Sequence, residues 1–151
     1  MNTDFKIRKG EKEDLEIIVS NNIKMAKETE NKDLDYETVK AGVESALEDP
    51  KKGEYFVIEF REKIIGQLMI TKEWSDWRNC FFLWIQSVYT LPEFRGKGVF
   101  TKLFYHIESI AKKEGYCGLR LYVDRSNEKA IKVYNKLGMR ETEYLLFEKE
   151  F

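Results

Sequence analysis

The sequence predicts an α/β protein built on a mixed sheet, and two observations carry this prediction. First, the apolar run 81–89 leads through a glycine-spaced turn into the amphipathic helix 99–111 and then into the β-rich run 119–123. A strand, a helix and a strand in this order form a parallel, right-handed unit. Second, the β-rich runs 55–60 and 64–71 are separated by three charged residues, which predicts an antiparallel hairpin.

The amino-terminal elements follow from apolar periodicity. A short strand is predicted at 5–8, a helix at 12–27, and a second helix at 36–47 that stops before Pro50. The polar, acidic connector 28–35 lies between these helices. It is either a solvated loop or one wall of an acceptor site.

The carboxyl-terminal elements have clear stop signals. The helix that follows the glycine-spaced turn has a basic last turn and ends at Gly115. A helix is predicted at 127–137 with Gly138 as its stop, and a closing strand at 144–147.

Composition limits the class of protein. With 151 residues, one domain covering 1–151 is expected. Charged residues make up 35% of the chain but nearly cancel to a net charge of -1, which argues against a nucleic-acid partner. No apolar run approaches the roughly 20 residues that span a bilayer, and the amino terminus lacks the apolar core of a signal peptide. We therefore expect a cytoplasmic protein with no membrane partner.

The two cysteines predict neither a disulfide framework nor a zinc site. Cys80 and Cys117 are far apart in sequence, and neither has a second cysteine or a histidine at metal-ligand spacing. We interpret both as ordinary buried thiols and expect no metal.

The glycine-spaced turn 95–100 is the most informative segment, because it is suited to hold phosphate. Its two glycines allow consecutive amides to point at one anion, and the helix that follows adds its amino-terminal N–H groups. The spacing lacks the four residues that a Walker loop needs before Gly-Lys-Ser/Thr. A dinucleotide fingerprint would need a glycine where Thr101 stands, and Asp124 matches its ribose-binding acid only by coincidence.

This turn resembles the Arg/Gln-x-x-Gly-x-Gly/Ala loop of the GNAT superfamily of N-acetyltransferases. The downstream segment 127–139 is similar to the second signature of that family, with Asn127, Tyr134 and Gly138 in the expected order. One departure is Phe100, which stands where the family has a small residue. The resemblance implies a GNAT-like fold, in which a mixed, mostly antiparallel sheet has two splayed parallel strands and helices on both faces.

The resemblance also implies acetyl-CoA as co-substrate. The loop amides would hold its pyrophosphate, the exposed backbone of 88–90 would pair with the pantetheine arm, and the Val88 N–H would polarise the thioester carbonyl. Lys97 would add positive charge to the loop or simply be solvated. The residues assigned to acetyl-CoA are Val88, Tyr89, Thr90, Arg95, Gly96, Lys97, Gly98, Val99, Phe100 and Asn127.

Asn127 and Tyr134 are seven residues apart and share one face of their predicted helix. By resemblance, Asn127 contacts the pantetheine or the backbone near it, and Tyr134 donates a proton to the departing CoA thiolate. The competing roles are structural: Asn127 as a helix cap, which Ser126 could equally provide, and Tyr134 as a half-buried aromatic.

The acceptor side has weaker signals. An amine attacks only when it is neutral, so a protonated, lysine-like amine must first lose a proton to a base. Glu73 is our first candidate for this base, with Asp76 second. Trp74 and Trp77 form either an aromatic wall for the acceptor or an ordinary turn.

The hypothesis from sequence is an acetyltransferase that moves the acetyl group of acetyl-CoA to a primary amine by direct attack in a ternary complex. The alternative is a non-catalytic acyl-CoA-binding sensor or interaction module. The acceptor is a small molecule or a protein, and a homodimer is one option that the resemblance leaves open.

Overall fold

The computed structural model describes residues 4–151. The chain forms two compact units, one ending at Leu121 and the other running from Tyr122 to Phe151. The first unit contains the whole sheet and three of the α-helices, and the second contains α4 (Glu128–Lys136) followed by irregular backbone. The expectation of a single domain stays a prediction.

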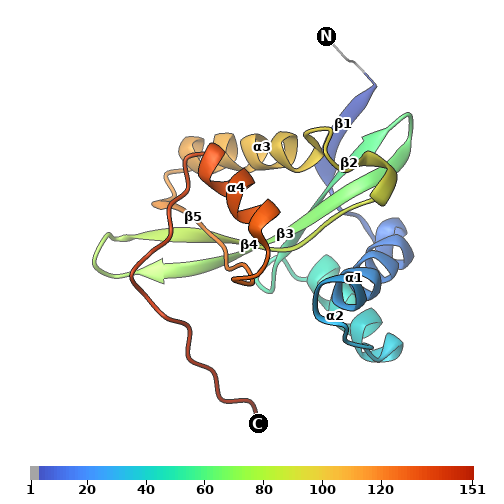
Figure 1. The fold of residues 1–151 in the computed structure, drawn as a ribbon, viewed down its shortest axis with the longest axis horizontal. Coiled ribbons are helices and arrows are strands. Elements are labelled where there is room, and N and C mark those ends of the chain that lie inside the picture. The colour runs from blue at the N-terminus through green and yellow to red at the C-terminus, as the bar shows by residue number, and fades with distance from the viewer. Residues whose placement is uncertain (1–3) are drawn as a thin grey trace. The chain divides into compact units, whose positions relative to one another are not determined.

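The first unit is organised around one five-stranded sheet with the order β1-β2-β3-β4-β5 (Figure 1). Neighbouring strands are antiparallel except β4 and β5, which are parallel. The predicted mixed, mostly antiparallel sheet is therefore confirmed. The strands are β1 (Phe5–Lys9), β2 (Glu54–Phe60), β3 (Lys63–Ser75), β4 (Cys80–Thr90) and β5 (Gly118–Arg120).

Helices cover both faces of this sheet, as predicted (Figure 1). A 3-10 turn (Lys12–Asp14) precedes α1 (Leu15–Glu30), which packs with α2 (Tyr36–Glu48) on one face. The other face carries α3 (Val99–Lys113). Because strand side chains alternate, Val57 packs in the core cluster under α1 and α2, whereas the neighbouring Phe56 lies against His106 of α3, with ring centroids 5.7 Å apart.

Gly66 on β3 allows the first turn of α3 to lie very close to the sheet. A Cβ built at Gly66 would come within 2.8 Å of Val99 Cγ1 and 3.1 Å of Ile58 Cγ2. Any larger residue would push α3 away, so this glycine fixes where the helix begins. That start is also where the glycine-spaced turn ends.

The predicted closing strand at 144–147 is wrong. The backbone there is irregular, and Tyr144, Leu145, Leu146 and Phe147 are each at least 68% exposed. The apolar run has the composition of a strand, but a strand also needs a hydrogen-bonded partner, and no described strand pairs with this segment.

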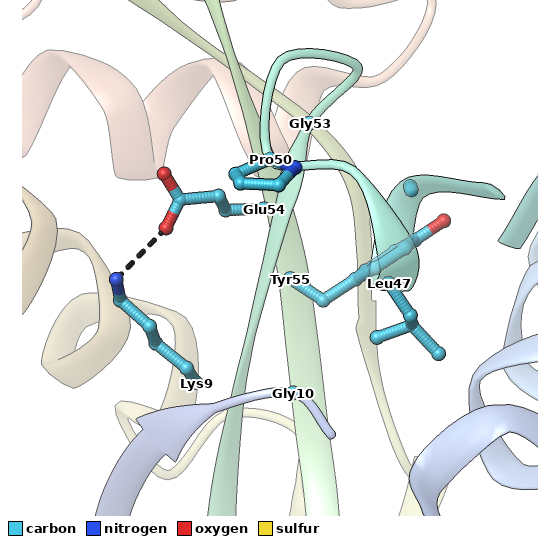
Figure 2. Close-up of a pocket in the computed structure, with 8 residues that line it drawn as sticks. Lys9, Gly10, Leu47, Pro50, Gly53, Glu54 and Tyr55 are labelled. Atoms are coloured by element: carbon cyan, nitrogen blue, oxygen red, sulfur yellow. Dashed lines mark ion pairs between the residues drawn. The ribbon is translucent and has the colours of Figure 1, made fainter. Parts of the chain in front are cut away.

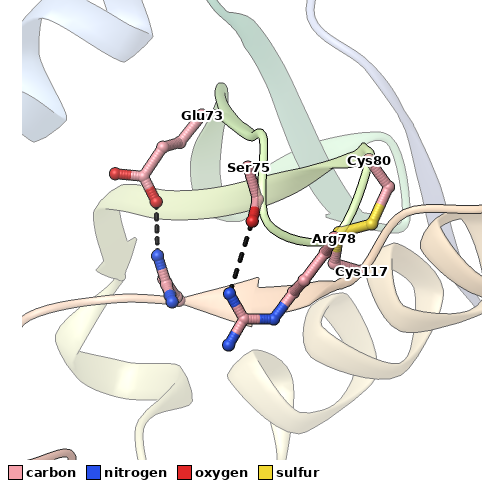
Figure 3. Close-up of a disulfide and its surroundings, with 6 residues drawn as sticks. Glu73, Ser75, Arg78, Cys80 and Cys117 are labelled. Carbon is pink, nitrogen blue, oxygen red and sulfur yellow. Dashed lines mark hydrogen bonds and ion pairs between the residues drawn. A yellow bond between two sulfur atoms is a disulfide. The ribbon is translucent and has the colours of Figure 1, made fainter.

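The interpretation of the cysteines as separate buried thiols is also wrong. Cys80 and Cys117 form a disulfide between the first residue of β4 and the segment that leads into β5 (Figure 3). Their Cα atoms are 5.7 Å apart, and the Cys117 N–H donates to the Phe81 carbonyl at 2.8 Å. The parallel pairing of β4 and β5 brings together two residues that are 37 positions apart.

Reduction of this disulfide is expected to lower the free energy of unfolding by about 3 kcal/mol, because the bridge restricts the unfolded chain. Urea denaturation with and without a reductant measures the change. The chain has only two cysteines, so a Cys80→Ser, Cys117→Ser variant is the control. The stability of this variant should match that of the reduced wild type and should not change when the reductant is added. A wild-type urea midpoint that is the same with and without the reductant would contradict the prediction.

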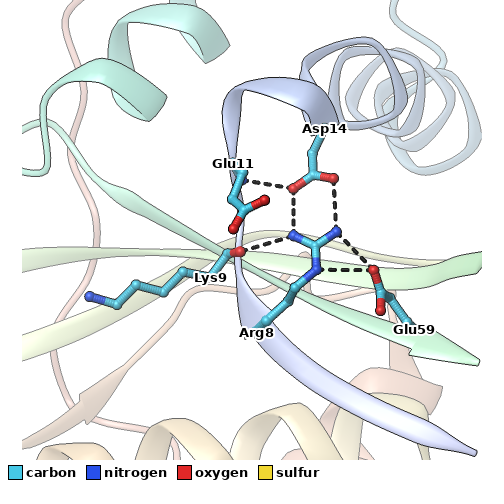
Figure 4. A network of polar contacts seen from close by, with 5 residues as sticks. All are labelled: Arg8, Lys9, Glu11, Asp14 and Glu59. Atoms are coloured by element: carbon cyan, nitrogen blue, oxygen red, sulfur yellow. Dashed lines mark hydrogen bonds and ion pairs between the residues drawn. The ribbon is translucent and has the colours of Figure 1, made fainter. Parts of the chain in front are cut away.

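A network of polar contacts connects β1 to β2 and to the 3-10 turn that precedes α1 (Figure 4). The Arg8 guanidinium donates to Asp14 at 2.7 and 3.0 Å and to Glu59 of β2 at 3.0 Å, while the Glu11 N–H donates to Asp14 at 2.7 Å. Burial alone would raise the pKa of Asp14, but these hydrogen bonds and the charge of Arg8 outweigh it and hold that pKa below its usual value.

An Asp14→Asn variant is expected to lose about 2 kcal/mol of unfolding free energy at neutral pH, because a charge-assisted pair is broken where it is shielded from water. The folded-state pKa of Asp14 lies below its unfolded value of about 3.9. Its contribution is therefore complete above about pH 4 and disappears as the pH falls through the lower folded value. Unfolding curves at several pH values test this, with the surface pair of Asp33 and Lys27 as control, since Asp33→Asn should change little.

Candidate functional site

The parallel strands β4 and β5 separate after a short pairing. Their ladder runs from Phe82 opposite Gly118 to Trp84 opposite Arg120, where β5 ends, but β4 continues to Thr90. Beyond Trp84, β4 is paired with β3 on one side only, among the described strands. The predicted splay is thus present, and the predicted residues Val88, Tyr89 and Thr90 all lie on the free-edged part of β4.

A β-bulge lies in this part of β4. Gln86 is opposite Met69 and Tyr89 is opposite Gln67, so Ser87 and Val88 together face only one residue of β3. Ser87 has a φ of 53°, in the left-handed region that costs a non-glycine residue about 1 to 2 kcal/mol. The bulge turns the peptide that contains the Val88 N–H out of the regular ladder.

The loop that follows β4 has the conformation expected of an anion site. Gly96 and Gly98 have φ values of 75° and 76°, and both are exposed together with Lys97. Gly98 is the N-cap of α3, and no side chain caps this helix end. The first-turn N–H groups of α3 therefore have no helical carbonyl and no side-chain cap, which leaves a positive helix end for a phosphate group.

Two loop side chains lie against neighbouring rings. Lys97 Nζ is 5.6 Å from the ring centroid of Phe94. Phe100, the departure from the family pattern, is half-buried against Phe104 with ring centroids 6.1 Å apart. The bulky ring thus packs beside the core, while its backbone stays in the first turn of α3.

Arg95 joins the loop to both β4 and α1. Its Nε donates to the Thr90 carbonyl at 2.9 Å, and its Nη2 pairs with Glu28 Oε2 at 2.7 Å. The Tyr89 hydroxyl donates to the other oxygen of Glu28 at 3.1 Å, so one carboxylate receives both groups. Burial and this hydrogen bond raise the pKa of Tyr89. Sequence reasoning missed this pairing, which connects the last turn of α1 with the loop.

The acidic connector has less unpaired charge than its sequence indicates. Glu28 pairs with Arg95, Asp33 with Lys27 at 3.0 Å, and Glu30 lies 3.8 Å from Lys32. Asp35 caps α2 by accepting from the Thr38 N–H. These contacts weaken the case for a strongly negative acceptor wall.

Glu73 lies far from Val88 along the sheet. Glu73 is opposite Phe82 in the β3–β4 ladder, whereas the bulge that contains Val88 is opposite Leu68. The five residues from Leu68 to Glu73 correspond to about 17 Å along the strand. The Glu73 carboxylate forms an ion pair with Arg120 of β5 (Figure 3). Asp76 lies in the exposed turn beyond β3. A role for Glu73 as catalytic base stays a prediction.

Trp74 and Trp77 belong to the same distant hairpin. Trp74 is 52% exposed and packs edge-on against Phe81, with ring centroids 4.8 Å apart. Trp77 is 85% exposed. Both indoles are accessible, and the structure records no contact that joins either of them to the loop 95–100 among the described residues.

Asn127 and Tyr134 lie in the second unit, on α4. The side chain of Asn127 accepts from the Ala130 N–H at 3.2 Å, which makes it the N-cap of this helix. Tyr134 is half-buried, and its burial raises its pKa. Both alternatives from sequence analysis, cap and half-buried ring, describe what is seen, and the roles toward acetyl-CoA stay predictions.

A separate pocket of about 190 Å³ opens where α2 leads into β2 (Figure 2). Its rim includes the ion pair between Lys9 and Glu54, 3.0 Å apart, and its wall includes Tyr55 and Leu47. None of the residues predicted to bind acetyl-CoA lines it. The pocket is therefore distinct from the candidate site.

Within residues 4–151, no group of three or more His, Cys, Asp or Glu side chains is placed to hold a metal ion. No helix in this range has both the length and the apolar character needed to cross a membrane.

Comparison with known proteins adds independent findings. A model of the acetyltransferase (GNAT) family matches residues 19–139. The thialysine N-epsilon-acetyltransferase of Mus musculus is 30% identical over 80 residues, which cover 52% of this chain and 45% of that protein. An uncharacterized N-acetyltransferase of Methanocaldococcus jannaschii is 32% identical over 90 residues, which cover 59% of this chain and 40% of that protein. The matches span less than half the length of either relative.

Solved structures agree with these matches. A protein described as a possible acetyltransferase from Clostridium difficile 630 is 44% identical, with 97% of both chains covered and a TM-score of 0.91. A predicted acetyltransferase from Clostridium acetobutylicum, solved with acetyl-CoA, is 18% identical, with 96% of both chains covered and a TM-score of 0.78. At that identity the second likeness shows the fold alone.

Proposed function

We propose that this chain, which belongs to the acetyltransferase (GNAT) family, moves the acetyl group of acetyl-CoA to a primary amine by direct attack in a ternary complex. The observation that carries the proposal is continuity: the free edge of β4 leads through one 3-10 turn (Pro92–Phe94) into the loop at the start of α3. A ligand with an extended amide-bearing arm and a diphosphate fits this sequence of main-chain groups.

We assign a partner in the chain to each part of acetyl-CoA. The amides of the loop and of the first turn of α3 bind the pyrophosphate, and the backbone of 88–90 pairs with the pantetheine arm. The Val88 N–H stabilises the negative charge that develops on the thioester oxygen as the amine attacks. Tyr134 returns a proton to the CoA thiolate, a role that rests on the family resemblance.

Several carboxylates are candidates for the base that takes a proton from the amine. Glu73, the first, would need a chain of water molecules to act at Val88 because of the length of strand between them. Glu28 is a candidate that the structure adds to Glu73 and Asp76, since it already lies beside the Tyr89 hydroxyl. Comparison of Glu73→Gln with Glu28→Gln identifies the base, because only its loss should remove the acidic limb of the kcat/KM profile.

The acceptor is a primary amine of a small molecule or a protein. The name of one similar protein, a thialysine N-epsilon-acetyltransferase, supports an amine on a small, polar molecule. Several acidic residues of the connector 28–35 are already in ion pairs, so the connector does not favour one class of cationic amine over another.

One observation favours a second candidate, a non-catalytic acyl-CoA-binding module: Glu73 is held by Arg120 instead of facing the free edge of β4. Release of CoA thiol from acetyl-CoA, measured with a panel of lysine-like amines, polyamines and aminoglycosides, separates the two. Amine-dependent release supports the enzyme. Tight acetyl-CoA binding without release on any amine would support the module and end the catalytic proposal.

A further inference from the structure

Three buried amide side chains connect α1 to the bulge of β4. Asn21 and Gln67 are fully buried, and Asn22 is 8% exposed. Asn21 Nδ2 donates to Gln67 Oε1 at 3.0 Å, and Gln67 Nε2 donates to Asn22 Oδ1 at 2.9 Å. Gln67 Nε2 also donates to the main-chain carbonyl of Ser87 at 3.2 Å. This chain of hydrogen-bonded amides therefore ends at Ser87, the residue with left-handed backbone.

This last contact fixes a direction. The Ser87–Val88 peptide is trans, because the described chain contains no cis bonds, so the Val88 N–H points away from the Ser87 carbonyl. A side chain that holds the carbonyl on the α1 side of β4 therefore also sets where the N–H points. It acts on the very group that is proposed to stabilise the thioester oxygen.

Packing alone does not explain these amides. The residues around them on this face form an apolar core cluster that includes Ile18, Val57 and Met69. Burying an amide there is unfavourable unless its groups are hydrogen-bonded, and Asn21 Oδ1 has no hydrogen-bond partner among the described residues. Leucine or methionine would fill the space of Gln67 without this cost. The contact with Ser87 is what an apolar side chain could not supply.

We propose that Gln67, held by Asn21 and Asn22, is a positioning residue that keeps the Ser87–Val88 peptide turned so that the Val88 N–H faces the thioester carbonyl. The inference rests on the proposed function, since it assigns the purpose of the bulge to acetyl transfer. Its structural half, that Gln67 maintains the left-handed conformation of Ser87, is independent of any activity.

The main test is Gln67→Met, which keeps the length of the side chain and removes its hydrogen bonds. The kcat is expected to fall about 30-fold, while the KM for acetyl-CoA changes less than about threefold, because oxyanion stabilisation acts on the transition state. In a crystal structure of the variant, the φ of Ser87 should leave the left-handed region.

A rescue variant distinguishes positioning from general damage. Glycine adopts positive φ without strain, so Ser87→Gly in the Gln67→Met background should recover several-fold of the lost kcat. Asn22→Leu added to Gln67→Met should not lower kcat further, because both side chains act through the same Ser87–Val88 peptide.

Val57→Ala is the matched control. Val57 is fully buried, lies opposite Gln67 on β2 and belongs to the same core cluster, but its side chain has no hydrogen-bonding group. It should lower the melting temperature and leave kcat within about twofold. If Gln67→Met does not fold, Asn22→Leu takes its place with the same crystallographic readout.

The outcomes are distinguishable. A Ser87 φ that stays near 53° in the variant, or an equal loss of kcat in Val57→Ala, overturns the inference. A wild-type protein that acetylates no amine overturns the proposed function, and the φ of Ser87 in wild type and variant still decides whether Gln67 positions the peptide.

Discussion

A Gly98→Asp variant is expected to bind acetyl-CoA about 1,000-fold more weakly than the wild type, while remaining folded. A Cβ at Gly98 would meet no atom within 4 Å, so the side chain has room. Aspartate is also one of the residues that tolerate left-handed backbone and cap helices. The loss should therefore come from the ligand site and not from the fold.

Two effects add up to this loss. A carboxylate about 5 Å from a diphosphate charge costs roughly 3 kcal/mol at an effective dielectric constant near 20. The same carboxylate accepts from first-turn N–H groups that would otherwise bind phosphate, which removes about 1 kcal/mol more. Calorimetric titration with acetyl-CoA and with free CoA measures the affinity.

Gly98→Asn is the control, because it has the same shape without the charge and should weaken binding only about tenfold. Added salt should narrow the difference between the two variants, since it screens the repulsion. Equal affinities of the aspartate and asparagine variants would show that the diphosphate binds elsewhere.

The second large effect is expected for Tyr134→Phe, with kcat lowered about 100-fold and the KM for acetyl-CoA changed less than about threefold. Burial raises the pKa of Tyr134, so the phenol keeps its proton at neutral pH. The thiolate of a thiol with a pKa near 8.5 is a weaker base than a phenolate, so proton transfer to the thiolate must accompany cleavage of the thioester.

Tyr144→Phe makes the same chemical change on an exposed tyrosine of the same unit and should leave kcat unaltered. Steady-state kinetics at saturating amine compares the two. The raised pKa also predicts that wild-type kcat does not fall from loss of this proton until the pH exceeds about 10. An unchanged kcat in Tyr134→Phe would assign protonation of the thiolate to water or to another group.

Local patterns were enough to predict the elements that build the site. The helix after the glycine turn was expected from its apolar stripe and glycine stop, and α3 runs from Val99 to Lys113. The hairpin of β2 and β3 and the parallel pairing of β4 with β5 were expected from β-rich runs and chain order. Periodicity and turn residues are properties of short segments, and a sequence displays them directly.

Contacts between distant segments could not be predicted in this way. Glu28 and Arg95 are 67 positions apart, and Cys80 and Cys117 are 37 apart, so neither pairing has a local signature. Residues 144–147 have the composition of a strand, but composition does not supply a pairing edge. The one local sign of the Gln67 set was a glutamine inside an otherwise apolar strand, which is noticeable only once its burial is known.

The close packing at Gly66 should couple the affinity for acetyl-CoA to the stability of the fold. With Val99 seated against β3, the loop amides acquire their directions when the sheet folds, and no ordering of a mobile loop is left to be done when the ligand arrives. Ligand and fold are then thermodynamically linked: acetyl-CoA at 100 times its Kd should protect the chain from unfolding by about 2.7 kcal/mol. A thermal shift would thus report binding of acetyl-CoA, even before an acceptor amine is known.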